Sequence, residues 1–193
     1  MNPSSSAQAN NPMTRLAPSS SSELSAKRGV APLYSQRLPL LQPTDASMRH
    51  ACVRLDMNDL QCFEKVRYQF EQWGVVFENA IALHPSNPAF PTRSGAIVLT
   101  GAPQSGWIGA EFRYPVSYVG AFVTSSRQIS LSAYNAKDEL VAKAEIPGSN
   151  LRDDTSIFQS NLLLSARGQQ IVRVVLQAFD GQLTLDELIY SAA

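Results

Sequence analysis

The chain has 193 residues, of which 16 are basic and 16 are acidic, so its formal net charge is zero. This balance provides no general attraction to nucleic acid or to an anionic lipid surface, and no uncharged apolar run approaches the roughly 20 residues that span a bilayer. Two cysteines cannot form a multi-disulfide scaffold. The composition therefore predicts one soluble domain with additional length.

The additional length is at the N-terminus. Residues 1–47 hold six of the twelve prolines and ten serines, and such a segment cannot bury enough apolar surface to offset an ordering entropy of roughly 1–2 kcal/mol per residue. We predict a disordered tail, within which the more apolar residues 29–41 form an extended strap. No basic start followed by an apolar core is present, so a secretory signal is not recognised and a cytoplasmic location is expected.

From residue 48 to residue 193 the sequence alternates between apolar and polar residues. The first candidate strand is 49–57, and residues 59–73 then place apolar side chains at steps of three and four up to Gly74, which predicts a short helix or helical turns. Further strands are predicted at 75–83, 95–100, 107–113, 117–124, 128–135, 139–146, 160–165, 171–178 and 182–190. Strands at a spacing of about 8–12 residues are typical of an antiparallel sandwich.

In an extended strand, successive side chains point to opposite faces of the sheet, so the period of two in the sequence predicts which residues share a face. In 128–135, Ile129 and Leu131 alternate with serines, which indicates one buried and one solvated face. In 182–190 the same rule places Leu183, Leu185 and Glu187 on one face and Asp186 on the other. Val119, Phe122 and Val123 are predicted to belong to the core.

Four stretches carry a resemblance to a known family: 73–83, 115–124, 129–148 and 180–190. Their order is similar to a jelly-roll sandwich family of bacterial, often cyanobacterial, surface and lectin-like proteins. The resemblance implies a fold like that of carbohydrate-binding modules and galactose-binding-like sandwiches. We therefore expect an all-β, antiparallel jelly-roll sandwich of about nine or ten strands with one short helix, preceded by the tail.

The resemblance also implies that the first and last strands pair. Asp56 and Asp59 lie at the end of the first predicted strand, and Asp186 lies in the last. Lectin-like jelly rolls often hold a structural calcium ion near that seam, and Ca²⁺ takes six to eight oxygen ligands. These three aspartates are accordingly a candidate calcium site, although the spacing also suits a turn and a helix cap.

A sugar site needs aromatic rings that stack on CH-rich faces and polar side chains that bond hydroxyl groups. The loops 84–94, 101–107 and 147–158 are expected to gather at the ends of the sandwich, where such folds place recognition. The candidate ligand-binding residues there and on the adjoining strands are Trp107, Tyr114, Asn150, Arg152 and Asp154.

Catalytic signatures are weak. Cys62 with His84 has no supporting spacing, and neither a phosphate-binding glycine loop nor a nucleophile elbow is present. Cys52 and Cys62 are expected to be reduced, partly buried thiols. We predict a non-catalytic, lectin-like module whose end loops recognise a glycan or another polar ligand. The alternative is a protein-interaction adaptor that docks through the strap and a sheet face.

Overall fold

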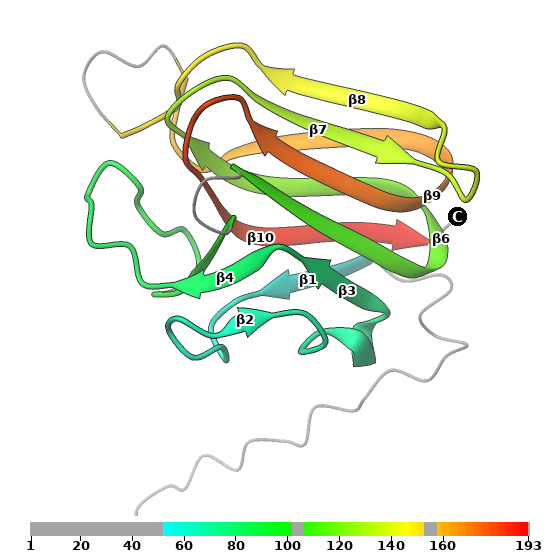
Figure 1. Cartoon of the computed structure of the whole chain (residues 1–193), viewed down its shortest axis with the longest axis horizontal. Coiled ribbons are helices and arrows are strands. Elements are labelled where there is room, and N and C mark those ends of the chain that lie inside the picture. The colour runs from blue at the N-terminus through cyan, green and yellow to red at the C-terminus, as the bar shows by residue number, and fades with distance from the viewer. Residues whose placement is uncertain (1–51, 102–105, 153–157, 193) are drawn as a thin grey trace, which may run out of the picture. The chain divides into compact units, whose positions relative to one another are not determined.

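The computed structural model describes residues 52–101, 106–152 and 158–192 (Figure 1). The predicted tail over 1–47 lies outside this part of the chain. The described residues form one antiparallel, ten-stranded sheet system with a single 3-10 turn, η1 (Glu71–Trp73). The strands are β1 (Cys52–Asp56), β2 (Lys65–Val66), β3 (Val75–Glu78), β4 (Ala80–Leu83), β5 (Val98–Gly101), β6 (Trp107–Ser125), β7 (Ile129–Tyr134), β8 (Leu140–Ile146), β9 (Leu162–Ala178) and β10 (Leu183–Ala192).

Two long strands connect the layers of the sandwich. The first part of β6 pairs with β3 and with the end of β9. The end of β9 in turn pairs with β7, and β7 pairs with β8. The second part of β6 pairs with β10 and with the start of β9. The register of β6 shifts between Glu111 and Val116, around Pro115, which cannot donate to a ladder. The predicted strands 107–113 and 117–124 are therefore one bent strand, and so are 160–165 and 171–178.

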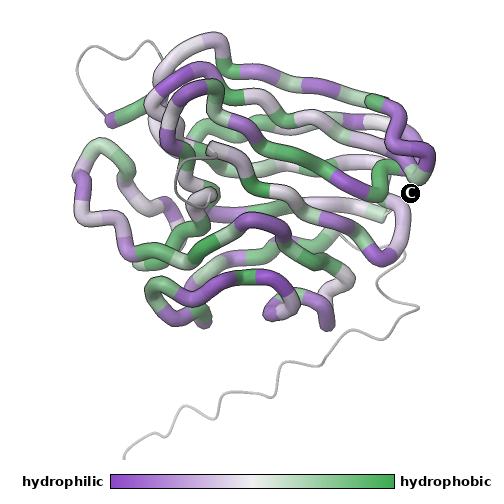
Figure 2. Tube along the Cα trace, viewed as in Figure 1, coloured by the Kyte–Doolittle hydropathy of each residue, from purple (hydrophilic) through white to green (hydrophobic). Residues whose placement is uncertain are grey.

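The predicted fold class is confirmed: the domain is an antiparallel jelly-roll sandwich, and its strands alternate as expected. Ile129 and Leu131 are fully buried, whereas the intervening serines are half-buried. Figure 2 shows the resulting alternation of hydrophobic and hydrophilic residues along the strands. Val119 and Val123 are buried as predicted, but Phe122 faces outward, where the guanidinium carbon of Arg93 lies 3.9 Å from the ring centroid.

The helical segment is much shorter than the pattern over 59–73 suggests. Only Glu71–Trp73 form a 3-10 turn, which ends at Gly74 with a φ of 74°. Upstream, Lys65 and Val66 pair with β4, so their backbone groups are engaged in a sheet rather than in a helix. The apolar spacing instead reflects burial of Val66 and Phe70, whose ring meets Phe77 edge-on at 5.5 Å.

The last strand is covered on both faces over Leu183–Leu188. A β-bulge lies between Leu185 and Glu187, which pair with the consecutive residues Val123 and Phe122 and leave Asp186 without a partner. The extra residue reverses the alternation, so Leu188 joins the core with Leu185. The predicted grouping of Glu187 with Leu183 and Leu185 is therefore wrong.

In the described part of the chain no helix has the length and hydropathy of a membrane span.

Candidate functional site

A large pocket opens at the end of the sandwich where β4, β5, β9 and β10 meet their loops; we call it the end pocket. Its volume is about 1100 Å³. Residues from the β4–β5 loop (84–97), both ends of the β5–β6 connection and the β9–β10 turn line it. Residues from two of the three loops that the sequence analysis expected to gather at the ends of the sandwich, 84–94 and 101–107, thus line the end pocket.

The end pocket contains two exposed aromatic rings, Phe63 and Phe179. Each side chain is 76% exposed, the highest exposure among the large hydrophobic residues that the structure describes. Large apolar side chains are normally buried, so two on one concave surface suggest a binding site. Polar side chains on the same lining, including Asn87, Gln177 and Gln182, offer hydrogen-bonding groups.

Phe63 is held in an unfavourable backbone conformation. Its φ is 69°, in the left-handed region that bulky residues rarely adopt. Its N–H donates to the carbonyl of Ala82 (2.7 Å), and the N–H of Ala82 donates to the carbonyl of Glu64 (3.0 Å). These bonds to β4 fix the backbone on both sides of the exposed ring. Strain of this kind is concentrated at functional sites.

Phe179 is also held by its surroundings. Its N–H donates to the carbonyl of Gln128 (3.1 Å), and Gln182, at the other end of the turn, donates to the hydroxyl of Ser126 (2.9 Å). Asp180 supplies the positive φ of 52° that a tight turn needs. The ring therefore lies on a turn that is bonded to its neighbour, which reduces the ordering entropy that ligand binding would otherwise require.

The β4–β5 loop, seen in green beyond β4 in Figure 1, contributes residues to both the end pocket and a smaller hollow. The smaller hollow has a volume of about 430 Å³ and includes His84 and Arg152 in its lining. Pro85, Ser86, Asn87 and Phe90 line both spaces, so they form a shared wall. The N–H of Arg152 donates to the carbonyl of Ala89 (2.9 Å), which ties the backbone at residue 152 to this wall.

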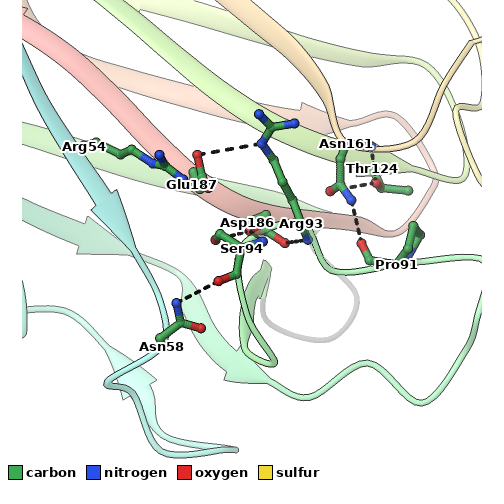
Figure 3. A network of polar contacts seen from close by, with 9 residues as sticks. All are labelled: Arg54, Asn58, Pro91, Arg93, Ser94, Thr124, Asn161, Asp186 and Glu187. Atoms are coloured by element: carbon green, nitrogen blue, oxygen red, sulfur yellow. Dashed lines mark hydrogen bonds and ion pairs between the residues drawn. The ribbon is translucent and has the colours of Figure 1, made fainter.

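The other end of the same loop is fixed by the buried carboxylate of Asp186 (Figure 3). One oxygen accepts the N–H of Arg93 (2.5 Å), and the other accepts both the N–H of Ser94 (3.1 Å) and its hydroxyl (2.7 Å). The β-bulge turns this side chain toward the loop at the position on β10 where pairing changes from β5 to β1. Asp186 is therefore a structural anchor for the loop.

Further polar contacts in Figure 3 surround this anchor. Glu187, which is 1% exposed, forms ion pairs with Arg54 and Arg93. Its hydrogen bond and charge raise the pKa of the Arg54 guanidinium above its ordinary value. Asn161 donates to the carbonyl of Pro91 (2.8 Å) and accepts a longer bond from the hydroxyl of Thr124 (3.4 Å). The buried acids of β10 are thus engaged in holding the loop.

The structure does not combine the predicted calcium ligands. β1 and β10 pair as expected, but both carboxylate oxygens of Asp186 accept hydrogen bonds from the loop. Asp56 and Asp59 are exposed, and Asp56 accepts the N–H of Asn58 (3.1 Å) in a local turn. Within the described residues, no group of three or more His, Cys, Asp or Glu side chains is arranged to hold a metal ion.

The predicted ligand-binding residues are also dispersed. Trp107 is half-buried with its ring over Gly109, and Tyr114 lies in the bend of β6; neither belongs to the lining of the two hollows. Asn150 is fully buried, where it bonds the N–H of Ser125 (2.6 Å) and the carbonyl of Val123 (2.8 Å). Of the five, Arg152 lines a hollow, and Asp154 lies outside the described residues.

The sequence predictions missed Phe63 and Phe179. A signal for Phe179 was available, because an aromatic residue directly before the Asp180-Gly181 turn lies at a corner of the sheet rather than in its interior. Phe63 falls inside the pattern that predicted helical turns, which concealed it. Cys52 and Cys62 are free and exposed rather than partly buried, and the sulfur of Cys62 accepts the N–H of His84 (3.3 Å).

Comparison with known proteins finds no matching family model and no matching curated protein. Similar solved structures include CsCBM6-3 from Clostridium stercorarium in complex with cellobiose (11% identity, 73% of this chain and 94% of that chain, TM-score 0.39). Another is a β-1,3-glucan-binding CBM6 from Bacillus halodurans (11% identity, 75% of this chain and 97% of that chain, TM-score 0.38). A third is the cleaved adhesin domain of Lys-gingipain from Porphyromonas gingivalis (9% identity, 74% of this chain and 99% of that chain, TM-score 0.43). At these values the similarity provides no correspondence between individual residues.

Proposed function

We propose that this domain is a non-catalytic binding module that takes a carbohydrate or another polar ligand in the end pocket. The observation that supports this most strongly is the pair of aromatic rings, Phe63 and Phe179, exposed on the lining of one pocket. A free hydrophobic ring in water is unfavourable, and a ligand face that covers it releases that free energy.

The lining has the mixed chemistry that a sugar requires. The CH-rich face of a pyranose ring packs against an aromatic ring, while its hydroxyl groups need directed donors and acceptors. Gln177 and Gln182 carry amide groups that both donate and accept. Asn87, whose oxygen accepts the N–H of Ala89 (3.0 Å), offers its NH₂ group, and the Thr100 hydroxyl, which donates to the carbonyl of Leu183 (3.0 Å), offers an acceptor. The pocket volume of about 1100 Å³ is sufficient for a short oligosaccharide.

A binding role also agrees with the use of the buried acids. General acid–base chemistry on a glycosidic bond needs a pair of carboxyl groups that face the substrate. Asp186 and Glu187 instead accept hydrogen bonds and ion pairs from Arg54, Arg93 and Ser94. The contacts of these two residues therefore support loop positioning rather than turnover.

The test is a glycan array followed by titration calorimetry with the best ligand. Phe179→Ala is expected to weaken binding about tenfold, since a lost ring contact is worth roughly 1–1.5 kcal/mol. Tyr68→Ala removes another exposed aromatic ring, outside the pocket, and is the matched control. Thermal unfolding of both variants verifies that they are folded.

Two results would contradict the proposal. Glycan binding that Phe179→Ala leaves unchanged would place the ligand elsewhere on the domain. No binding across the array would favour the alternative predicted from the sequence, a protein-interaction adaptor that docks through its N-terminal strap and a sheet face.

A further inference from the structure

The two hollows beside the β4–β5 loop differ in charge. The described lining of the smaller hollow includes the charged Arg152 and the imidazole of His84, and no carboxylate. The described lining of the end pocket has a single charged residue, Asp180, next to Phe179. Among the described residues, a ligand that reaches across the shared wall therefore meets an arginine on one side and an aromatic ring beside a carboxylate on the other.

The shared wall allows one ligand to contact both sides. Ser86 and Asn87 are exposed on it and line both hollows. The wall is held by the bond from Arg152 to Ala89 and by the anchor at Asp186, so its position relative to Arg152 is set by the fold. Arg152 itself is exposed and belongs to the lining of the smaller hollow.

An arginine selects among polar ligands by charge and shape. Its planar guanidinium presents parallel N–H donors that match the two oxygens of a carboxylate, and a charge-assisted pair of this kind is about twice as strong as a neutral hydrogen bond. A neutral sugar hydroxyl cannot use this geometry fully. Arg152 in the smaller hollow therefore favours an acidic ligand over a neutral one.

We propose that the ligand is an acidic oligosaccharide, with the carboxylate of a uronic-acid residue bound at Arg152 and a neighbouring sugar ring stacked on Phe179. This inference rests on the proposed function and specifies its ligand class. The carboxylate at Arg152 lies in the smaller hollow, and the CH-rich face of the neighbouring ring lies against Phe179. His84 contributes a further ring nitrogen to the carboxylate end.

The experiment compares oligouronates with their own methyl esters, because esterification removes the charge and preserves the sugar. The probes are oligogalacturonate, oligoglucuronate and oligomannuronate, each free and esterified, titrated into the full chain. The free acid of at least one series is expected to bind about tenfold more tightly than its ester. Raising the salt concentration is expected to reduce this preference.

Arg152→Gln is expected to bring the acid and its ester to equal affinity, and Arg152→Lys to retain part of the difference. Arg113→Gln, at an exposed arginine in the bend of β6, changes the net charge equally and is expected to leave the preference intact. Equal affinity of acid and ester for the unmodified chain, or a preference that survives in Arg152→Gln, would overturn the inference.

These failures differ from a failure of the proposed function. If neutral glycans bind in a manner that depends on Phe179 and acids bind no better, the acidic ligand is wrong and the carbohydrate-binding module stands. If neither acids nor neutral glycans bind, both are wrong.

Discussion

Replacing Asp186 by asparagine tests whether this residue anchors the β4–β5 loop. The carboxylate is 1% exposed and accepts two backbone N–H groups and one hydroxyl group from Arg93 and Ser94. Asparagine has nearly the same shape but keeps only one acceptor oxygen, and its NH₂ group would face a backbone donor. The change therefore removes charge and leaves at least one donor without an acceptor.

The expected cost follows from these three bonds. A hydrogen bond to a charged group contributes about 1.5–3 kcal/mol, and an orphaned buried donor costs about 1–3 kcal/mol, although such values do not add fully. We expect Asp186→Asn to lower the free energy of unfolding by about 3 kcal/mol, which corresponds to a Tm lower by roughly 10 °C for a domain of this size. Ser94→Ala removes only the hydroxyl bond and should cost about 1 kcal/mol.

Urea denaturation followed by tryptophan fluorescence measures the stability, and hydrogen exchange locates the effect, with the amides of residues 93 and 94 expected to lose protection. Asp59→Asn, at an exposed aspartate, is the matched control and should remain within about 0.5 kcal/mol of the original chain. A cost for Asp186→Asn no larger than that of the control would refute the anchoring role.

Three further predictions concern Tyr190, Asn150 and Phe63. Burial raises the pKa of the Tyr190 hydroxyl to about 12, so the unfolded chain releases this proton first, and the free energy of unfolding should fall as pH rises from about 10 toward 12. Tyr190→Phe should flatten that part of a stability–pH curve, and an unchanged slope would exclude Tyr190 as its source. Asn150→Ala should lower the unfolding free energy by about 2–4 kcal/mol in denaturant titrations, because Asn150 is buried and bonds three backbone groups; a cost under about 1 kcal/mol would argue against this structural role. Phe63→Asn should stabilise the domain by about 0.5–1 kcal/mol in the same assay, since asparagine tolerates the left-handed conformation, and it should also weaken glycan binding. A loss of stability would mean that the conformation at Phe63 is not strained.

Much of the architecture was predictable from local patterns. The alternation in Ile129–Tyr134 and the Asp180-Gly181 turn depend on neighbours within a few residues, so they can be recognised without knowledge of the fold. The same applies to the two loops that border the end pocket. The bend of β6 could not be recognised in this way, because Pro115 interrupts the pattern whether the strand ends or turns between layers.

The candidate site depended on tertiary structure to a greater extent. Asp186 looked like a possible metal ligand because carboxylates bind calcium, but its hydrogen-bonding partners Arg93 and Ser94 lie more than ninety residues away in the chain. Asn150 looked like an exposed loop residue, yet it is fully buried between strand ends.

Side-chain period and turn chemistry are local properties of the chain, so most of the sequence from residue 48 onward could be recognised as extended segments with one buried face, whereas the pattern over 59–73 predicted helical turns. The polar groups that hold the fold, and the exposure of the Phe63 and Phe179 rings, became apparent from the tertiary structure alone. Exposure depends on which distant segment packs against a side chain, and the β-bulge at Asp186 reverses the facing of the residues after it in β10, up to the next register shift at Ser191.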